Sequence, residues 1–195
     1  MLELSNAQIG GWVAQFMLPL FRIAALLMSM PIIGTQLVPT RVRLYLALAI
    51  TLLLAPTLGP MPLVEALSLR ALLLIAEQIL IGVMLGFVLQ LFFHVFIVSG
   101  QLLAMQMGLG FASMVDPANG ISVTVLAQYF TVLLTLVFLA SNGHLAMLEV
   151  LLESFRYLPA GSGAFGPEPS WTLVSAASWL FLSGLLLALP TVIAL

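Results

Sequence analysis

Long apolar runs alternate with short polar breaks along the whole chain. Five of these runs approach the roughly 20 residues that a helix needs to cross the hydrocarbon core of a bilayer. They cover Ile9 to Ile33, Leu44 to Leu58, Ala71 to Ser99, Ile121 to Ala140 and Trp171 to Leu195. The pattern predicts an all-α fold of hydrophobic helices, forming a single membrane-associated domain over residues 1–195.

Prolines and polar residues interrupt several of these runs. The interruptions are Pro19, Arg22, Pro56, Glu77, Gln78, Gln90 and His94. A plain lipid-facing anchor lacks such residues, because proline breaks the helix ladder and polar groups are costly in hydrocarbon. We therefore expect broken or kinked helices that face protein over much of their surface.

Three of the polar residues, Arg22, Glu77 and Gln90, are candidates for contacts with another subunit. An ionisable side chain inside an apolar run is costly and usually pairs with a polar group or lines water. For Arg22 the alternative is snorkelling towards an interface. Glu77 lies two helical turns after Arg70, too far for a contact within the helix, so an intermolecular partner is plausible. A solvated helix start explains Arg70 equally well.

Small residues recur one helical turn apart in several runs. The pairs are Gly82 with Gly86, Ala25 with Ser29, and Gly184 with Ala188. Such spacing lets helix backbones approach closely, and Gly82 and Gly86 are therefore further candidates for contact with another subunit. Chance is the alternative, since the chain is rich in glycine and alanine.

Residues 105 to 120, MQMGLGFASMVDPANG, break the apolar pattern most strongly. Each glycine weakens a helix by about 1 kcal/mol relative to alanine. Asp116-Pro117 followed by Asn119-Gly120 is a strong turn signal. Non-helical backbone at membrane depth is tolerated only where it is surrounded by protein or lines water. A flexible, methionine-rich interruption of this kind is expected of a loop that blocks a pore and can move aside; an ordinary interhelical turn is the alternative.

The composition excludes several classes of protein. Hydrophobic residues make up 63% of the chain, charged residues 6%, and the mean hydropathy is +1.24. Soluble domains carry about 25% charged residues, so a soluble fold is excluded. With five Lys plus Arg and a net charge of −2, no basic patch exists to bind nucleic acid. The absence of cysteine excludes disulfides and thiolate metal sites.

The two ends of the chain differ. The N-terminus has no basic region before its first apolar run, so we expect it to be retained rather than cleaved as a signal peptide. The last run has no polar cap, and we expect the natural protein to continue beyond Leu195.

The remaining charged residues do not form a recognisable catalytic or metal site. Glu149, Glu153 and Arg156 follow helical spacing and predict a solvated stripe. His94 and His144 lack the spacing of metal ligands and are expected to pack or cap. The chain has no P-loop and no Rossmann fingerprint, so we expect no cofactor and no catalysis.

Two arginines, Arg41 and Arg43, predict that their loop lies on the cytoplasmic side.

Three stretches resemble the FliR/SctT family of type III export-apparatus proteins. They are Pro31-Ile-Ile-Gly34 running into Val38-Pro-Thr-Arg-Val-Arg43, the block MGLGFASMVDPANG from Met107, and Val125-Leu-Ala-Gln-Tyr129. The resemblance covers nearly the whole chain in order and spacing, and the second block is the most specific. It implies a non-enzymatic core component of a helical, multi-subunit export gate, whose subunits form hydrophobic helical hairpins.

The resemblance also implies partners and a location. Homologues of FliP and FliQ would share one complex with this chain, together with FlhB and FlhA homologues, membrane lipid and unfolded export substrates. The location implied is the bacterial inner membrane at the flagellar basal body. Family members continue past an apolar segment like the last one here, which agrees with the expected missing C-terminal part.

The family's central plug maps onto Met105 to Asn119. The residues implied in sealing are Met105, Gln106, Met107, Gly108, Gly110, Phe111, Met114, Asp116 and Pro117.

Two other functions remain as alternatives. A secondary transporter could bind a small solute at the broken segment 105–120, but it predicts an inverted repeat, and no second broken segment is found in the other half. An intramembrane enzyme could use Asp116, but no second acid occurs in a comparable helical context.

Overall fold

The computed structural model describes residues 6–59, 61–62, 68–116, 120–161, 182–189 and 193. Within these residues the chain is helical, which confirms the all-α prediction. The helices are α1 (Asn6–Ser29), α2 (Thr40–Leu54), α3 (Leu69–Gln106), α4 (Val125–Ala140) and α5 (Gly143–Tyr157). Residues 182–189 are also helical. A short hairpin of β1 (Ser113–Val115) and β2 (Ser122–Thr124), which the apolar pattern did not predict, lies between α3 and α4.

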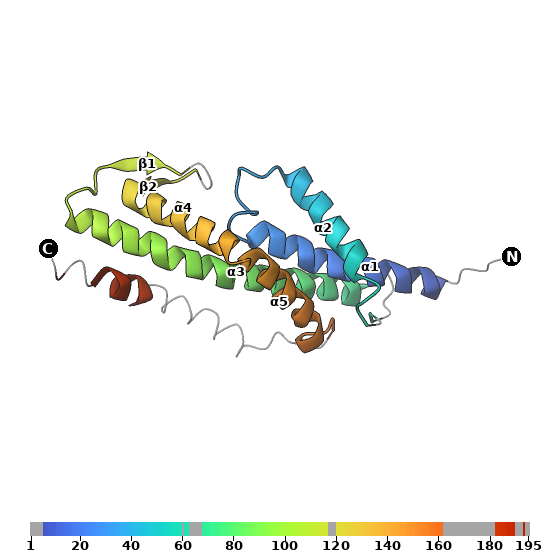
Figure 1. Cartoon of the computed structure of the whole chain (residues 1–195). Helices are drawn as coiled ribbons and strands as arrows, with labels where there is room; N and C mark the ends of the chain where they lie inside the picture. Colours follow the sequence, from blue (N-terminus) through green and yellow to red (C-terminus); the bar gives the residue numbers. More distant parts are fainter. Residues whose placement is uncertain are drawn as a thin grey trace.

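The longest helix, α3, forms the axis of an elongated molecule (Figure 1). Helix α1 packs along its first half and α4 along its second half, while α2 lies across α1. Helix α5 bends away from α4 by 68°. The hairpin lies at one end of the molecule, over the end of α3 and the start of α4 (Figure 1).

Local chemistry sets most helix ends. The Ser68 hydroxyl accepts a hydrogen bond from Ala71 N at 3.1 Å and caps α3; Thr124 does the same for α4 through Ala127 N at 3.3 Å. Helix α2 stops at Leu54, because Pro56 has no N–H with which to continue the hydrogen-bond ladder. Pro56 thus ends a helix rather than kinking it, whereas Pro19 lies inside α1.

The main core lies where α1, α2 and α5 meet. Its buried residues are Ile23, Leu26, Leu27, Ala47, Leu151 and Phe155. Because α5 contributes two of these side chains, this late helix is packed onto the first helix.

Small residues join α1 to α3 as the sequence predicted. A β-carbon on Gly82 would lie 2.8 Å from Ala25 Cβ, and one on Gly86 would lie 2.8 Å from Ser29 Cβ. The two small-residue pairs therefore face each other within one chain, and any larger side chain would push the helices apart. Gly184 packs in the same way against Val98 of α3, and Ser99 Oγ donates to Gly184 O at 3.0 Å.

Only α3, among the described helices, is both long and apolar enough to cross a membrane by itself. The bent pair of α4 and α5 passes the same test as a broken span, and the apolar part of α1, Ala14–Ser29, is shorter. The described residues thus contain fewer membrane-length helices than the apolar runs predicted, because turns divide the runs into shorter helices. The run Trp171 to Leu195 lies mostly outside the described residues.

Candidate functional site

The broken segment begins where α3 ends, and Gly108 causes the end. Leu109 N donates to Ala104 O at 2.8 Å and Gly108 N to Met105 O at 3.2 Å, which is the hydrogen-bond pattern of a Schellman motif. Gly108 has a φ of 72°, the left-handed conformation that this motif requires at its glycine. Met105 and Gln106 are thus the last helical residues, and the predicted break starts after them.

A two-stranded antiparallel hairpin follows the turn. Met114 pairs with Val123, and the turn closes through Asp116 N donating to Ile121 O at 2.8 Å and Gly120 N donating to Asp116 O at 2.8 Å. Gly120 has a φ of 71°, as the Asn-Gly signal predicted. Pro117 lies outside the described residues. The alternation of apolar and polar residues after this turn, Ile121-Ser-Val-Thr124, together with the turn residues, is the signal that could have predicted a hairpin.

Apolar side chains of the segment point away from the rest of the chain. Phe111 is fully exposed at 100%, and Met105, Met107 and Met114 are exposed at 66%, 49% and 48%. Gly110 stands beside Phe111 with only Met105 near it. Asp116 is the exception, because the exposed fraction of this residue is only 3%. The segment therefore presents a methionine-rich apolar surface on a hairpin whose turn is buried at one end.

A cavity of about 320 Å³ lies beside the buried end of the hairpin. It is enclosed by the connection between α1 and α2, by the middle of α3, by α4, and by Asp116. Gln90 and His94 line it from α3, and Gln128 lines it from α4. Gln128 Oε1 is buried without a hydrogen-bond partner in the described part of the chain. The cavity leaves one side of the hairpin's turn without packed support.

Arg22 lies at the junction of three helices and is completely buried. Its Nε donates to Gln78 Oε1 at 2.8 Å, its Nη1 to Ser154 O at 2.9 Å, and its Nη2 to Leu158 O at 2.8 Å. The Cζ atom stands 4.2 Å from the Phe155 ring centre, within the range of a cation–π contact. The last two carbonyls belong to the end of α5, where a cation is favoured.

Arg22 therefore finds inside its own chain the partners that we expected in a neighbouring subunit, and complete burial excludes snorkelling. Gly82 and Gly86 likewise contact α1 of the same chain. The sequence could not identify Gln78, Ser154 or Leu158 as the partners of Arg22, because they follow it by 56 to 136 positions.

Glu77 and Gln90 occupy different surroundings. Glu77 Oε2 accepts a hydrogen bond from Gly161 N at 3.2 Å, while its Oε1 is buried without a hydrogen-bond partner among the described residues. Gln90 lines the cavity, and its main-chain carbonyl oxygen lies 2.8 Å from His94 Nδ1. Both residues remain candidates for contact with another subunit.

Three further charged residues lie on the surface, as their helical spacing predicted. Glu149, Glu153 and Arg156 are exposed on one face of α5. His144 Nδ1 is buried without a hydrogen-bond partner in the described ranges. Those ranges contain no group of three or more His, Cys, Asp or Glu that could hold a metal ion.

Comparison with known proteins places the chain among export proteins. Residues 13–195 match the family described as bacterial export proteins, family 1. The chain is 40% identical over 192 residues to the flagellar biosynthetic protein FliR of Escherichia coli (strain K12), covering 98% of this chain and 73% of that protein. It is 37% identical over the same length to FliR of Pectobacterium carotovorum subsp. carotovorum. The surface presentation of antigens protein SpaR of Shigella flexneri is 28% identical over 139 residues, 71% of this chain and 54% of that protein.

Proposed function

Since the chain belongs to the bacterial export proteins, family 1, and is a component of flagellar protein export, we propose that it forms and seals part of the export channel. In this proposal it acts without catalysis and assembles with FliP and FliQ homologues in the bacterial inner membrane, at the flagellar basal body. FlhB and FlhA homologues adjoin the complex. Unfolded substrates pass through the channel, and partner proteins supply the energy.

One observation carries the sealing role: the apolar side chains of the segment project from the hairpin and the turn before it, and much of their surface is left uncovered by the described chain. Phe111 is fully exposed, and the methionines on either side are about half exposed or more. A narrow apolar constriction resists wetting and therefore resists ions. Methionine suits such a seal because its unbranched side chain repacks around varied neighbours.

The surroundings of the segment support a role for a movable element. Gly108 ends the long helix α3, so the segment is not a continuation of a rigid rod. The cavity of about 320 Å³ leaves the hairpin's turn partly unsupported. The hairpin is joined to α3 through the turn at Gly108 and directly to α4 after Thr124, and the cavity beside its turn gives it room to shift as a unit.

Deleting Gly108 to Phe111 tests the sealing role. The deletion removes the most exposed aromatic side chain and shortens the approach to the hairpin, so it should raise the ion conductance of membranes that contain the complete complex. The complex should still assemble, because none of the four residues belongs to the buried core. Conductance is measured with an ion-sensitive dye in cells or with planar bilayers.

A matched pair of single substitutions controls for the loss of an exposed aromatic ring. Phe111→Ala should raise conductance, whereas Tyr157→Ala, which removes a ring exposed at 78% at the end of α5, should not. If the deletion assembles normally and the membrane stays tight to ions, the segment is an ordinary turn and the sealing role is wrong.

A further inference from the structure

The connection between α1 and α2, residues 30–38, is a tightly bonded loop. Gly34 N donates to Met30 O at 2.7 Å, and Thr35 Oγ1 donates to Ile32 O at 2.9 Å. Ile32 has a φ of 82°, a conformation that a β-branched residue rarely adopts unless its surroundings impose it. A β-carbon on Gly34 would lie 2.6 Å from Met30 O, so the loop also turns back closely on the end of α1. We call residues 30–38 the connecting loop.

Arg43, in the first turn of α2, fastens the connecting loop. Its Nη2 donates to Val38 O at 2.9 Å and to Thr35 O at 3.2 Å, its Nε donates to Val38 O at 3.2 Å, and its Nη1 donates to Gly34 O at 3.4 Å. Hydrogen bonds from a charged donor are stronger than neutral ones. The planar guanidinium spans three carbonyl oxygens at once, which a lysine ammonium cannot do with the same geometry. Arg41, two residues before Arg43 in the same helix, is exposed.

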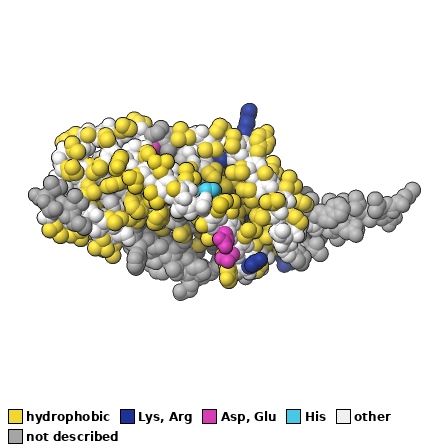
Figure 2. All heavy atoms as spheres, viewed as in Figure 1, with side chains coloured by type: hydrophobic (Ala, Val, Ile, Leu, Met, Phe, Trp, Pro, Cys, Tyr) yellow, Lys and Arg dark blue, Asp and Glu magenta, His cyan; other side chains and the backbone are white. Residues whose placement is uncertain are grey.

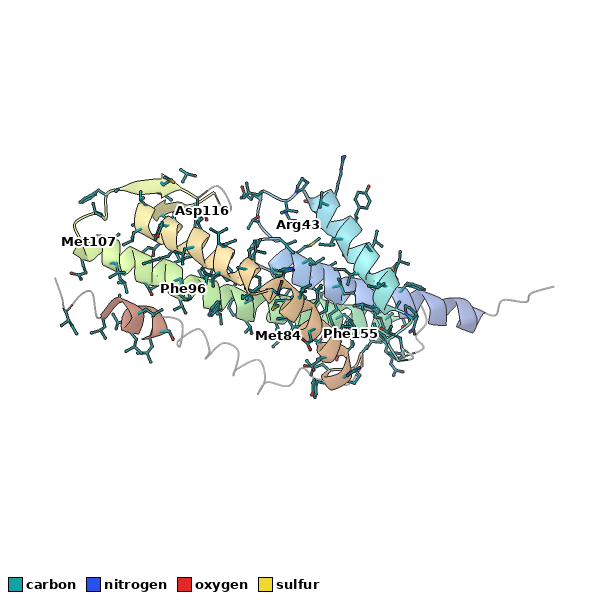
Figure 3. The ribbon with its side chains drawn as sticks, in the orientation of Figure 1. Arg43, Met84, Phe96, Met107, Asp116 and Phe155 are labelled. Carbon is teal, nitrogen blue, oxygen red and sulfur yellow. The ribbon has the colours of Figure 1, made fainter. Side chains whose placement is uncertain are left out.

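The connecting loop touches the turn of the hairpin. The position of a β-carbon on Gly120 lies 3.5 Å from Gln36 Oε1 and 3.6 Å from Gln36 Nε2, so the Gln36 amide lies beside this glycine. Gly34 and Thr35 line the same cavity as Asp116. Figure 3 shows Asp116 on the hairpin and Arg43 at the start of α2, with the connecting loop between them. The loop thus adds a contact to the hairpin's turn beside the cavity.

We propose that Arg43 is a positioning residue for the seal: it fastens the connecting loop, and the loop holds the hairpin's turn in the closed position. This inference rests on the proposed sealing function. The strained Ile32 and the adjacent cavity make the loop a support that depends on the Arg43 bonds, because the packing beneath it is incomplete. Losing those bonds should release the hairpin without unfolding the helices.

Thiol labelling in the assembled complex tests the release directly. The chain contains no cysteine, so one introduced thiol is unique within it. Val123 on β2 has an exposed fraction of 5%, and Val123→Cys should react slowly with a maleimide while the hairpin is held. In the Arg43→Ala background we expect the labelling rate to rise about tenfold, the population change expected from losing hydrogen bonds to a charged group.

Four controls make the result specific to the loop. Arg43→Lys should give an intermediate rate, and Arg41→Ala should leave the rate unchanged. Ala47→Cys, in the core with an exposed fraction of 0%, should stay unreactive in every background, which excludes general loosening. Gln36→Ala removes the contact at Gly120 but keeps the Arg43 bonds, and it should raise the rate as Arg43→Ala does. If Arg43→Ala does not assemble, Gln36→Ala decides, and an unchanged Val123→Cys rate overturns the inference.

Measuring conductance on the same variants separates this inference from the sealing function. Faster labelling together with higher conductance supports both. Faster labelling with unchanged conductance supports the role of Arg43 and overturns the sealing function. Unchanged labelling, while deletion of Gly108 to Phe111 raises conductance, overturns the role of Arg43 and leaves the sealing function standing.

Discussion

At the scale of single residues, Arg22 shows how a charge is accommodated in an apolar chain. Its guanidinium donates to an amide of α3 and to two carbonyls at the end of α5, and its face lies over Phe155. Burying a charge is costly unless it is paired and hydrogen-bonded. These contacts tie α1, α3 and α5 together, so Arg22 is a structural junction of the described chain.

We expect Arg22→Leu to lower the yield of assembled complex sharply. Each buried acceptor that loses its donor costs about 1–3 kcal/mol, and Gln78 and Ser154 are both buried. Native gel electrophoresis of solubilised membranes measures the yield. Arg156→Leu is the matched control, because its side chain is exposed on the same α5 helix and should change little. Normal assembly and motility with Arg22→Leu would contradict the junction role.

At the scale of elements, the end of α3 decides where the candidate seal begins. Gly108 and Gly110 looked equivalent in the sequence, yet only Gly108 has a left-handed φ. An L-residue in that conformation costs about 1–2 kcal/mol. The glycine pair therefore consists of one helix terminator and one position with ordinary backbone geometry.

Gly108→Ala should loosen the end of α3, whereas Gly110→Ala should be nearly neutral. A β-carbon at Gly108 meets no atom within 4 Å, so the cost is conformational; at Gly110 its nearest contact is an ordinary 3.6 Å to Met105 Cγ. Hydrogen exchange of the Leu109 amide, which donates to Ala104 O, should quicken about tenfold with Gly108→Ala, since 1.4 kcal/mol is a factor of ten. Equal exchange rates in the two variants would show that Gly108 does not terminate the helix.

At the scale of the whole molecule, the apolar surface is too large for an isolated chain in water. Apolar side chains cover much of the visible face, and charged side chains are few (Figure 2). The apolar side chains that are exposed above 60% in the described chain include Tyr45, Leu53, Leu69 and Leu136. Soluble monomers rarely expose contiguous apolar patches beyond a few hundred Å². Lipid, sister subunits or both must cover these helices.

Expressed alone, the chain should aggregate or be degraded, and expressed with its partners it should enter one large complex. The reason is the uncovered apolar surface together with polar groups such as Glu77 Oε1, which lacks a hydrogen-bond partner in the described chain. Size-exclusion chromatography in a mild detergent measures both outcomes. A monodisperse, stable monomer would count against obligate assembly.

Local patterns in the sequence determined much of this protein. The apolar runs predicted a helical membrane-associated chain, and the glycines and the Asp-Pro and Asn-Gly pairs located the break at residues 105–120. These signals depend on groups within a few bonds of each other: a proline without an N–H, a glycine that accepts positive φ, a hydroxyl that caps the next turn. The small-residue pairs also predicted close helix contact, although not which helices would meet.

Only the tertiary structure decided which distant residues meet. Arg22 bonds to groups 56 to 136 positions later, Gln36 lies beside Gly120, and Arg43 and Asp116 stand on opposite sides of one loop. Among the described residues, the same structure showed the apolar runs to be fewer membrane-length helices and the break to be a hairpin beside a cavity. The physical reason is that a side chain's energy depends on whatever packs against it, and for buried polar groups those neighbours are brought together by the fold, not by their order in the chain.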